Sequence, residues 1–209
     1  TKGRDRTGIT RAVNMKPPPI NKALPASLNT EVCLKLGDRI STDDILPAGR
    51  WLKYRSNIEE YAKHTFAGID PTFAHRALEN LERDVFSLIV AGDNYGQGSS
   101  REHAAMCPLV LGVRVVLAKS YERIHMANLI NHGIIPLSFM DPHEYDQINK
   151  DDYLELPWIA RELRKSKTIS LRNPDRGVEF KVSHQMTRRQ INIVLDGGLH
   201  SYSLNRNQR

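Results

Sequence analysis

The feature that most constrains this chain is a glycine-rich loop between two apolar segments. The loop reads Gly-Asp-Asn-Tyr-Gly-Gln-Gly-Ser-Ser-Arg-Glu-His over residues 92–103, directly after the apolar run at residues 86–91. Glycine lets a backbone turn sharply and approach a ligand closely. The first turn of a helix adds free N–H groups and a partial positive charge. The pattern therefore predicts a strand, a turn and a helix whose junction suits an anion held beside a serine hydroxyl.

A purely structural interpretation of the loop also exists. Ser99 and Glu102 fit the S-x-x-E capping box, in which a serine does nothing more than cap a helix. A cap needs one hydroxyl, however, whereas this loop carries Ser99, Ser100 and Arg101 in succession and His103 shortly after. The full string therefore favours a functional site over a simple cap.

Apolar patterning along the chain predicts alternating strands and helices. We expect strands over residues 31–36, 85–91, 113–119, 134–137, 167–172 and 178–182. We expect helices over residues 57–63, 71–81, 100–111, 121–131 and 187–195. Alternation of this kind is typical of an α/β core with a parallel component. The turn at residues 173–177 predicts a hairpin between the last two strands.

The amino-acid composition limits the class of protein to which the chain can belong. The 209 residues are 40% hydrophobic, which is enough for one buried core. No run approaches the roughly 18 apolar residues of a membrane helix. The two cysteines, Cys33 and Cys107, show neither metal-ligand spacing nor a disulfide framework. Residues 1–30 are rich in proline and predict an extended linker, which leaves residues 31–209 as the folded domain.

Three collinear segments resemble one known family. Residues 92–103 look like the signature loop of the C-terminal swivel domain of the aconitase family. Residues 38–55 are similar to the segment that opens that domain, and residues 119–137 to its strand–helix–strand continuation. The resemblance spans about residues 31–140. It implies a swivelling β/β/α domain of the α/β class, with a mixed, partly parallel sheet or barrel flanked by helices.

The resemblance also implies a chemistry. Members isomerise hydroxy acids by removing and re-adding water, so the expected activity is that of a hydro-lyase interconverting citrate and isocitrate through cis-aconitate. Ser99 matches the catalytic base, and Ser100 and Arg101 match residues that bind a substrate carboxylate. Arg55 matches a second carboxylate-binding arginine, and Asp43 a catalytic-site aspartate that orients these groups.

Further residues are expected to lie in or near the site. Gly96, Gly98, Glu102 and His103 are expected to support the loop. Aconitases commonly have histidine where this chain has Asp44, which weakens the substrate assignment. His125, in a pattern Ile124-His125…Asn128 similar to aconitases, is interpreted as a packing or hydrogen-bonding residue rather than a ligand.

The resemblance places the cofactor outside this chain. The family's [4Fe-4S] cluster is held by three cysteines from other domains, and this sequence has two in unrelated positions. We therefore expect no metal ligands here, an inactive isolated domain, and a partner in the form of cluster-bearing domains or a large subunit. The substrate is expected to be a tri- or dicarboxylate, and we expect no membrane association. The expected location is cytoplasmic, with the mitochondrial matrix as the alternative.

Other functions stay open. The closest is the small subunit of an isopropylmalate or homoaconitate isomerase, and Arg55 argues for citrate against it because a tricarboxylate needs an additional cation. RNA binding fits the net charge of +6 and the pI of about 9.4, but no aromatic stripe runs among the basic residues. A scaffold with a vestigial site is the third alternative.

Overall fold

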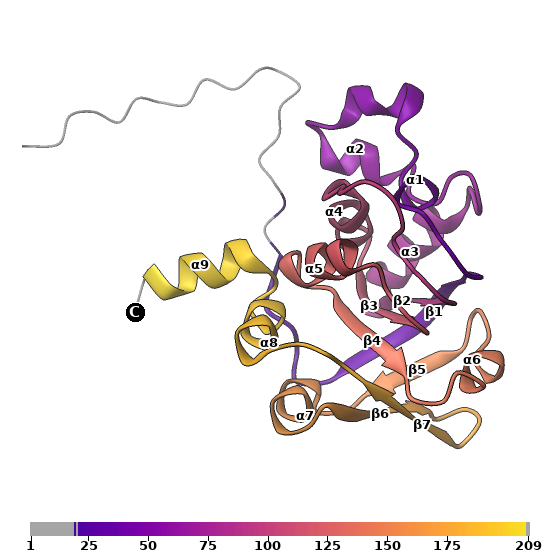
Figure 1. Ribbon diagram of the computed structural model, residues 1–209, viewed down its shortest axis with the longest axis vertical. Helices are drawn as coiled ribbons and strands as arrows, with labels where there is room; N and C mark the ends of the chain where they lie inside the picture. The colour runs from indigo at the N-terminus through magenta and orange to yellow at the C-terminus, as the bar shows by residue number, and fades with distance from the viewer. Residues whose placement is uncertain (1–18, 20, 208–209) are drawn as a thin grey trace, which may run out of the picture.

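A closed barrel organises the part of the chain that the computed structural model describes, residue 19 and residues 21–207 (Figure 1). Its strands are β1 Leu28–Lys35, β2 Phe86–Ala91, β3 Val113–Ala118, β4 Ile135–Phe139, β5 Tyr153–Leu156, β6 Thr168–Asn173 and β7 Val178–Ser183. The helices are α1 Thr42–Ile45, the 3₁₀ helix η1 Gly49–Tyr54, α2 Ile58–Ala62, α3 Phe73–Glu82, α4 His103–Val110, α5 Arg123–Asn131, α6 Glu144–Gln147, α7 Ile159–Lys165, α8 Arg188–Leu195 and α9 Leu199–Asn207.

The strand order mixes parallel and antiparallel neighbours. Around the barrel the order is β1-β2-β3-β4-β7-β6-β5. The four strands β1 to β4 are parallel to one another, whereas β5, β6 and β7 join them and each other in antiparallel fashion. This confirms the expected α/β class and the expected mixed, partly parallel sheet or barrel.

The parallel strands are buried on both faces. In β2, Leu88 and Val90 pack in a core shared with β5, β6 and β7. Ile89 and Ala91 point the other way and pack beneath helices α1 to α4. Burial on both sides explains why residues 88–91 of β2 form a continuous apolar run rather than an alternating pattern. In Figure 1 these helices lie together on one side of strands β1 to β3, and the hairpin β6–β7 lies on the other side.

Several boundaries differ from those expected. Helix α4 begins at His103, three residues later than predicted, because residues 98–102 form bends and a turn rather than regular helix. Strand β5 and helices α7 and α9 were not predicted. Strand β1 begins at Leu28, inside the segment assigned to an extended linker.

Part of that predicted linker lies against the domain. We call residues 21–27 the strap. The Leu24 N–H donates to the carbonyl of Leu195 over 2.9 Å, and Ser201 Oγ donates to the Asn21 carbonyl over 3.0 Å. The expected domain boundary at residue 30 is therefore too late, because side chains and backbone from residue 21 onward are bonded to the barrel and its helices. Residues 1–18 and 20 lie outside the described residues.

No helix within residues 21–207 has the length and apolar character of a membrane span.

Candidate functional site

The glycine loop, residues 92–102, lies at the carboxyl edge of three adjacent parallel strands. It follows β2, while the segments after β1 and β3 flank it. Its Gly96 N–H donates to the Ile40 carbonyl over 2.7 Å, and the Thr42 N–H donates to the Gln97 carbonyl over 2.7 Å. In open parallel sheets, ligands bind at this edge because loops from neighbouring strands converge there. Loops from the parallel strands of this barrel converge in the same way, so we place the candidate site at this edge.

A hollow of about 200 Å³ opens between the loop and helix α5. We call it the loop pocket. Ser99, Ser100 and Arg101 form one wall, and residues 122–125 with Asn128 form the other. The hydroxyls of Ser99 and Ser100 have no hydrogen-bond partner among the described residues, and both residues are exposed. The structure therefore brings five of the expected site residues to one small hollow, namely Gly96, Gly98, Ser99, Ser100 and Arg101.

Two glycines allow the loop to close on its neighbours. Gly96 has a φ of +91°, and a Cβ built on it would lie 2.3 Å from the ring of His125. Gly98 has a φ of +106°, and its Cβ would lie 3.3 Å from Thr42 Oγ1. L residues with a side chain rarely adopt such φ values. The close approach of His125 makes glycine a packing requirement at position 96 as well.

Arg101 is held by Asp43. The guanidinium donates to Asp43 Oδ1 over 2.6 Å and more weakly to the Leu46 carbonyl over 3.5 Å. The Arg101 side chain is 28% exposed and that of Asp43 62%. Asp43 does not line the loop pocket, so it contacts the site through the arginine. The orienting role expected of Asp43 stays a prediction.

Arg55 lies at the end of η1, near the start of α4. The Nε2 atom of His103 is 3.0 Å from the Arg55 carbonyl, and the His103 ring tilts against Tyr61 at a centroid distance of 5.6 Å. The Arg55 side chain is exposed and is not among the side chains that line the loop pocket. The structure thus connects Arg55 to the loop through backbone and His103. Its predicted carboxylate-binding role stays a prediction.

The capping interpretation of Ser99 is wrong. Helix α4 has Glu102 at its N-cap position, and no side chain caps it. A capping box forms instead at α1, where Asp44 Oδ2 accepts from the Ser41 N–H over 2.8 Å and from Ser41 Oγ over 2.6 Å. Asp44, the position where the sequence departs from the aconitase pattern, therefore has a structural role in starting the helix that carries Asp43.

Two buried polar residues in the pocket were not predicted as site residues. His125 is 2% exposed and Asn128 8% exposed. Burial lowers the pKa of His125 to about 4, so the ring is neutral at pH 7. Neither ring nitrogen of His125, nor Nδ2 of Asn128, has a hydrogen-bond partner among the described residues. The sequence feature that could have indicated them is their i, i+3 spacing, which puts both side chains on one face of the helix that follows β3.

The cysteines do not suit a cluster. Cys33 and Cys107 are buried, and burial raises the pKa of both thiols, whereas Fe–S ligation needs thiolates. Among residues 19 and 21–207, no group of three or more His, Cys, Asp or Glu side chains is placed to hold a metal ion. No chemical step is therefore assigned to a cluster held by these residues.

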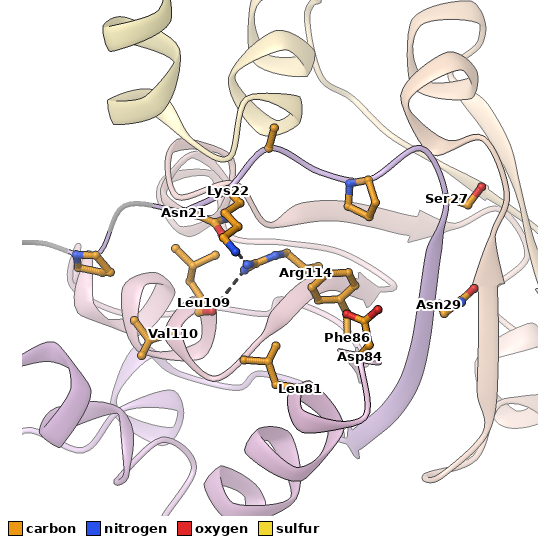
Figure 2. A pocket seen from close by; sticks show the side chains of 13 residues that line it. Asn21, Lys22, Ser27, Asn29, Leu81, Asp84, Phe86, Leu109, Val110 and Arg114 are labelled. Atoms are coloured by element: carbon orange, nitrogen blue, oxygen red, sulfur yellow. Dashed lines mark hydrogen bonds between the residues drawn. The ribbon is translucent and has the colours of Figure 1, made fainter.

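A larger hollow, of about 630 Å³, lies at the opposite edge of the sheet. Figure 2 shows the strap crossing it, with Arg114 and Phe86 from the beginnings of β3 and β2. The Arg114 guanidinium lies over the Phe86 ring and donates to the Leu109 carbonyl and to Asn21 Oδ1 (Figure 2). These contacts hold the strap in place, so this hollow is interpreted as a feature of strap packing.

Comparison with known proteins identifies the family. The family model described as the aconitase C-terminal domain matches residues 70–142. A crystal structure of 3-isopropylmalate dehydratase from Methanocaldococcus jannaschii superposes with a TM-score of 0.67 and 31% identity, covering 87% of this chain and 96% of that one. The chain belongs to the aconitase C-terminal domain family. The superposition also confirms the expected swivel-domain fold.

Curated relatives of this aconitase C-terminal domain differ in substrate. A probable mitochondrial aconitate hydratase from Dictyostelium discoideum is 32% identical over 84% of this chain and 25% of its own length. A mitochondrial homocitrate dehydratase from Saccharomyces cerevisiae is 33% identical over the same shares. The chain thus spans about a quarter of the length of the curated relatives it matches. Both relatives are named as mitochondrial, so they give the expected cytoplasmic location no support.

Proposed function

We propose that this domain supplies the catalytic base and a carboxylate-binding wall of an aconitase-type hydro-lyase. The observation that carries the proposal is the loop pocket, which brings Ser99, Ser100 and Arg101 together at the carboxyl edge of the parallel strands. Membership of the aconitase C-terminal domain family supplies the reaction class.

The proposed chemistry is proton abstraction beside a carboxylate. Arg101 binds a substrate carboxylate through its planar guanidinium, with Asp43 holding it in place over 2.6 Å. Ser99, whose side chain no described residue engages, first loses its hydroxyl proton to solvent; the alkoxide then takes the proton from the carbon beside the substrate carboxylate and becomes a hydroxyl again. The negative charge that develops on the substrate is stabilised by the guanidinium and by the Ser100 hydroxyl.

The complete enzyme is proposed to need a second part. The domain spans about a quarter of its curated relatives, and its two buried cysteines do not suit a cluster. We propose that cluster-bearing domains or a large subunit close over the loop pocket and complete the site. The isolated domain should then show no turnover.

Citrate and isocitrate are the proposed substrates, with the isopropylmalate or homocitrate reactions as the alternative. The curated relatives named for aconitate and homocitrate favour tricarboxylates. The structural relative is named for 3-isopropylmalate. An Arg55→Ala change should separate these alternatives, because loss of this cation should reduce turnover of citrate far more than turnover of isopropylmalate.

Reconstitution tests the proposed function. The domain is joined to the cluster-bearing portion of an aconitate hydratase, and cis-aconitate formation from citrate is followed by its ultraviolet absorbance. Ser99→Ala should lower kcat by roughly 10²-fold or more, the range typical of a lost general base. Ser203→Ala, an exposed serine on α9, is the matched control and should keep full activity. Full activity in the Ser99→Ala enzyme would exclude the proposed base.

A second candidate function is supported by one cluster that sequence patterning did not predict. The Trp51 and His64 rings stack at a centroid distance of 3.6 Å, Arg50 lies over Trp51 at 4.4 Å, and Lys53 lies over Tyr54 at 5.0 Å. Aromatic rings among cations are typical of single-strand binding. Trp51→Ala should then weaken a salt-dependent affinity for a short single-stranded RNA in fluorescence anisotropy. Lys181→Ala serves as the control on the distant strand β7.

We propose the mitochondrial matrix as the compartment, in place of the cytoplasm, because the curated relatives are named as mitochondrial. Fluorescence imaging of the tagged full-length protein tests this assignment.

A further inference from the structure

The wall of the loop pocket that helix α5 forms contains polar atoms with no hydrogen-bond partner among the described residues. His125 is 2% exposed and Asn128 8%, and both line the pocket from helix α5. Both ring nitrogens of His125 and the Nδ2 atom of Asn128 lack a hydrogen-bond partner among the described residues. Buried polar groups in folded proteins are nearly always hydrogen-bonded, so three such atoms beside one hollow indicate a missing partner.

Neighbouring residues hold the histidine ring by packing alone. The ring lies against Gly96, where a Cβ would approach it to 2.3 Å, and tilts against Tyr95 at a centroid distance of 5.3 Å. Neither contact engages a ring nitrogen. The ring is thus fixed in position, and no described residue uses its hydrogen-bonding capacity.

The N-terminus of helix α5 also favours binding of an anion at this wall of the loop pocket. The helix has nine residues, and its N-cap residue Glu122 makes no side-chain cap. Residues 122–124 line the pocket together with His125 and Asn128. Uncapped N–H groups and the partial positive charge at a helix start favour a negatively charged group. The Arg123 side chain adds a positive charge at the same rim, and Glu122 opposes it.

We propose that His125 and Asn128 bind the substrate directly, through hydrogen bonds to oxygen atoms of the arm that lies opposite Ser99 and Arg101. This inference rests on the proposed function and names the substrate class of the same pocket. An acid whose second arm carries carboxylate or hydroxyl oxygens would satisfy these atoms, whereas an apolar arm would leave them buried and unpaired. The domain should therefore prefer hydroxy polycarboxylates to acids with a branched hydrocarbon arm.

The chemistry of the two side chains fits this assignment. Asn128 Nδ2 can only donate, so it suits a carboxylate oxygen. A neutral imidazole offers one donor and one acceptor, so His125 suits a second carboxylate oxygen or a substrate hydroxyl. Neither residue adds a charge. They would select between arms of the substrate while Arg101 binds the carboxylate of the other arm.

Nuclear magnetic resonance of the full chain tests the proposal with citrate and 2-isopropylmalate as probes. Citrate should shift the backbone amides of residues 99–101 together with the Hε1–Cε1 resonance of the His125 ring. His125→Phe keeps an aromatic ring against Gly96 and removes both nitrogens, and Asn128→Leu removes the amide. Each should weaken citrate binding about tenfold, the factor that corresponds to one lost buried hydrogen bond, and should leave 2-isopropylmalate unaffected.

The matched control is His184→Phe. His184 is also 2% exposed and has an unpartnered Nδ1, but it lies outside the loop pocket. Its loss should leave citrate affinity unchanged. The melting temperature of His125→Phe should equal or exceed that of the wild type, because no protein hydrogen bond is lost. A merely structural histidine would instead lower the melting temperature without changing affinity in the folded fraction.

The outcomes separate this inference from the proposed function. If citrate shifts residues 99–101 but not the His125 ring, or binds the folded variants as tightly as the wild type, the inference is wrong and the proposed function stands. If citrate produces no shift at residues 99–101 of the wild type, both fail. The ring resonance needs no substitution, so the test holds even if a variant does not fold.

Discussion

Gly96 shows how a single missing side chain shapes the site. Its φ of +91° strains any L side chain, and an added Cβ would lie 2.3 Å from the His125 ring. Gly96→Ala should therefore lower the free energy of unfolding by more than the roughly 1–2 kcal/mol that a positive φ alone costs. Urea denaturation measures this difference.

Gly177 provides the matched control for that change. It also has a positive φ, of +65°, but no atom lies within 4 Å of its hypothetical Cβ. Gly177→Ala should carry the conformational cost without the collision. Equal losses for the two variants would show that the His125 ring moves freely and that the close approach does not constrain position 96.

The buried ring of His125 also predicts a dependence of stability on pH. Its pKa of about 4 lies below the unfolded value of about 6.5, because burial disfavours the charged form. Between these values the unfolded chain binds a proton that the folded chain does not, so stability falls as the pH falls from about 6.5 to 4. The loss at the lower end is at most about 3 kcal/mol.

Substitution isolates the contribution of this histidine. His125→Phe should give a shallower decline of unfolding free energy when urea denaturation is repeated at several pH values in this window. Some slope will persist, because burial also lowers the pKa of His132 and His184. An unchanged slope would mean that the ring is protonated in the folded protein.

At the scale of elements, a four-residue helix positions the carboxylate that holds Arg101. Ser41 and Asp44 cap α1 reciprocally, and Asp43 lies between them in the helix. Ser41→Ala removes the cap and should lower the free energy of unfolding by about 1 kcal/mol. Chemical denaturation checks the value, with exposed Ser203→Ala expected within about 0.5 kcal/mol of the wild type. A loss no greater than that of Ser203→Ala would show that α1 needs no cap.

The elements that sequence patterning predicted best are those buried on both faces. Strands β2 and β3 contain continuous apolar runs at residues 88–91 and 115–118. The hairpin β6–β7, which is partly exposed on one face, was predicted from its Asn-Pro-Asp-Arg-Gly turn instead. Strand β5 was missed because it has only four residues and half of them are partly exposed. Helix α9 was missed because its sequence is polar and follows two glycines.

The start of α4 shows why the site was harder to predict than the strands. Ser99 and Glu102 have the spacing of a cap, yet tertiary contacts determine their conformation. The Ser99 carbonyl accepts from Thr42 Oγ1 over 3.2 Å, and Gly96 is bonded to Ile40, so the loop is tied to the segment after β1. The unpartnered atoms of His125 could not be predicted either, because burial without a partner is a property of packing.

At the scale of the whole molecule, the strap is predicted to stabilise the barrel. A chain that starts at Leu28 would lose the hydrogen bonds of Leu24 to Leu195, of Asn21 to Ser201 and Arg114, and of Ser27 to Trp158. Four lost hydrogen bonds predict a decrease of about 4 kcal/mol in the free energy of unfolding. Thermal and urea unfolding should be compared with a chain that starts at Pro19, which keeps these contacts. Equal stability of the two chains would show that the strap is only a connection.

The pairing of β5 with β1 has a consequence for association. Because it completes the ring, each strand within residues 28–183 has a neighbour on both sides, although β5 meets β6 at a single residue pair and β4 meets β7 at two. The closed order leaves no free edge strand for a second polypeptide to extend along its whole length. Another domain would therefore have to be recognised through side chains and the connecting loops. Assembly of this domain with another should be sensitive to point substitutions in those loops and insensitive to substitutions within strands β1 to β7.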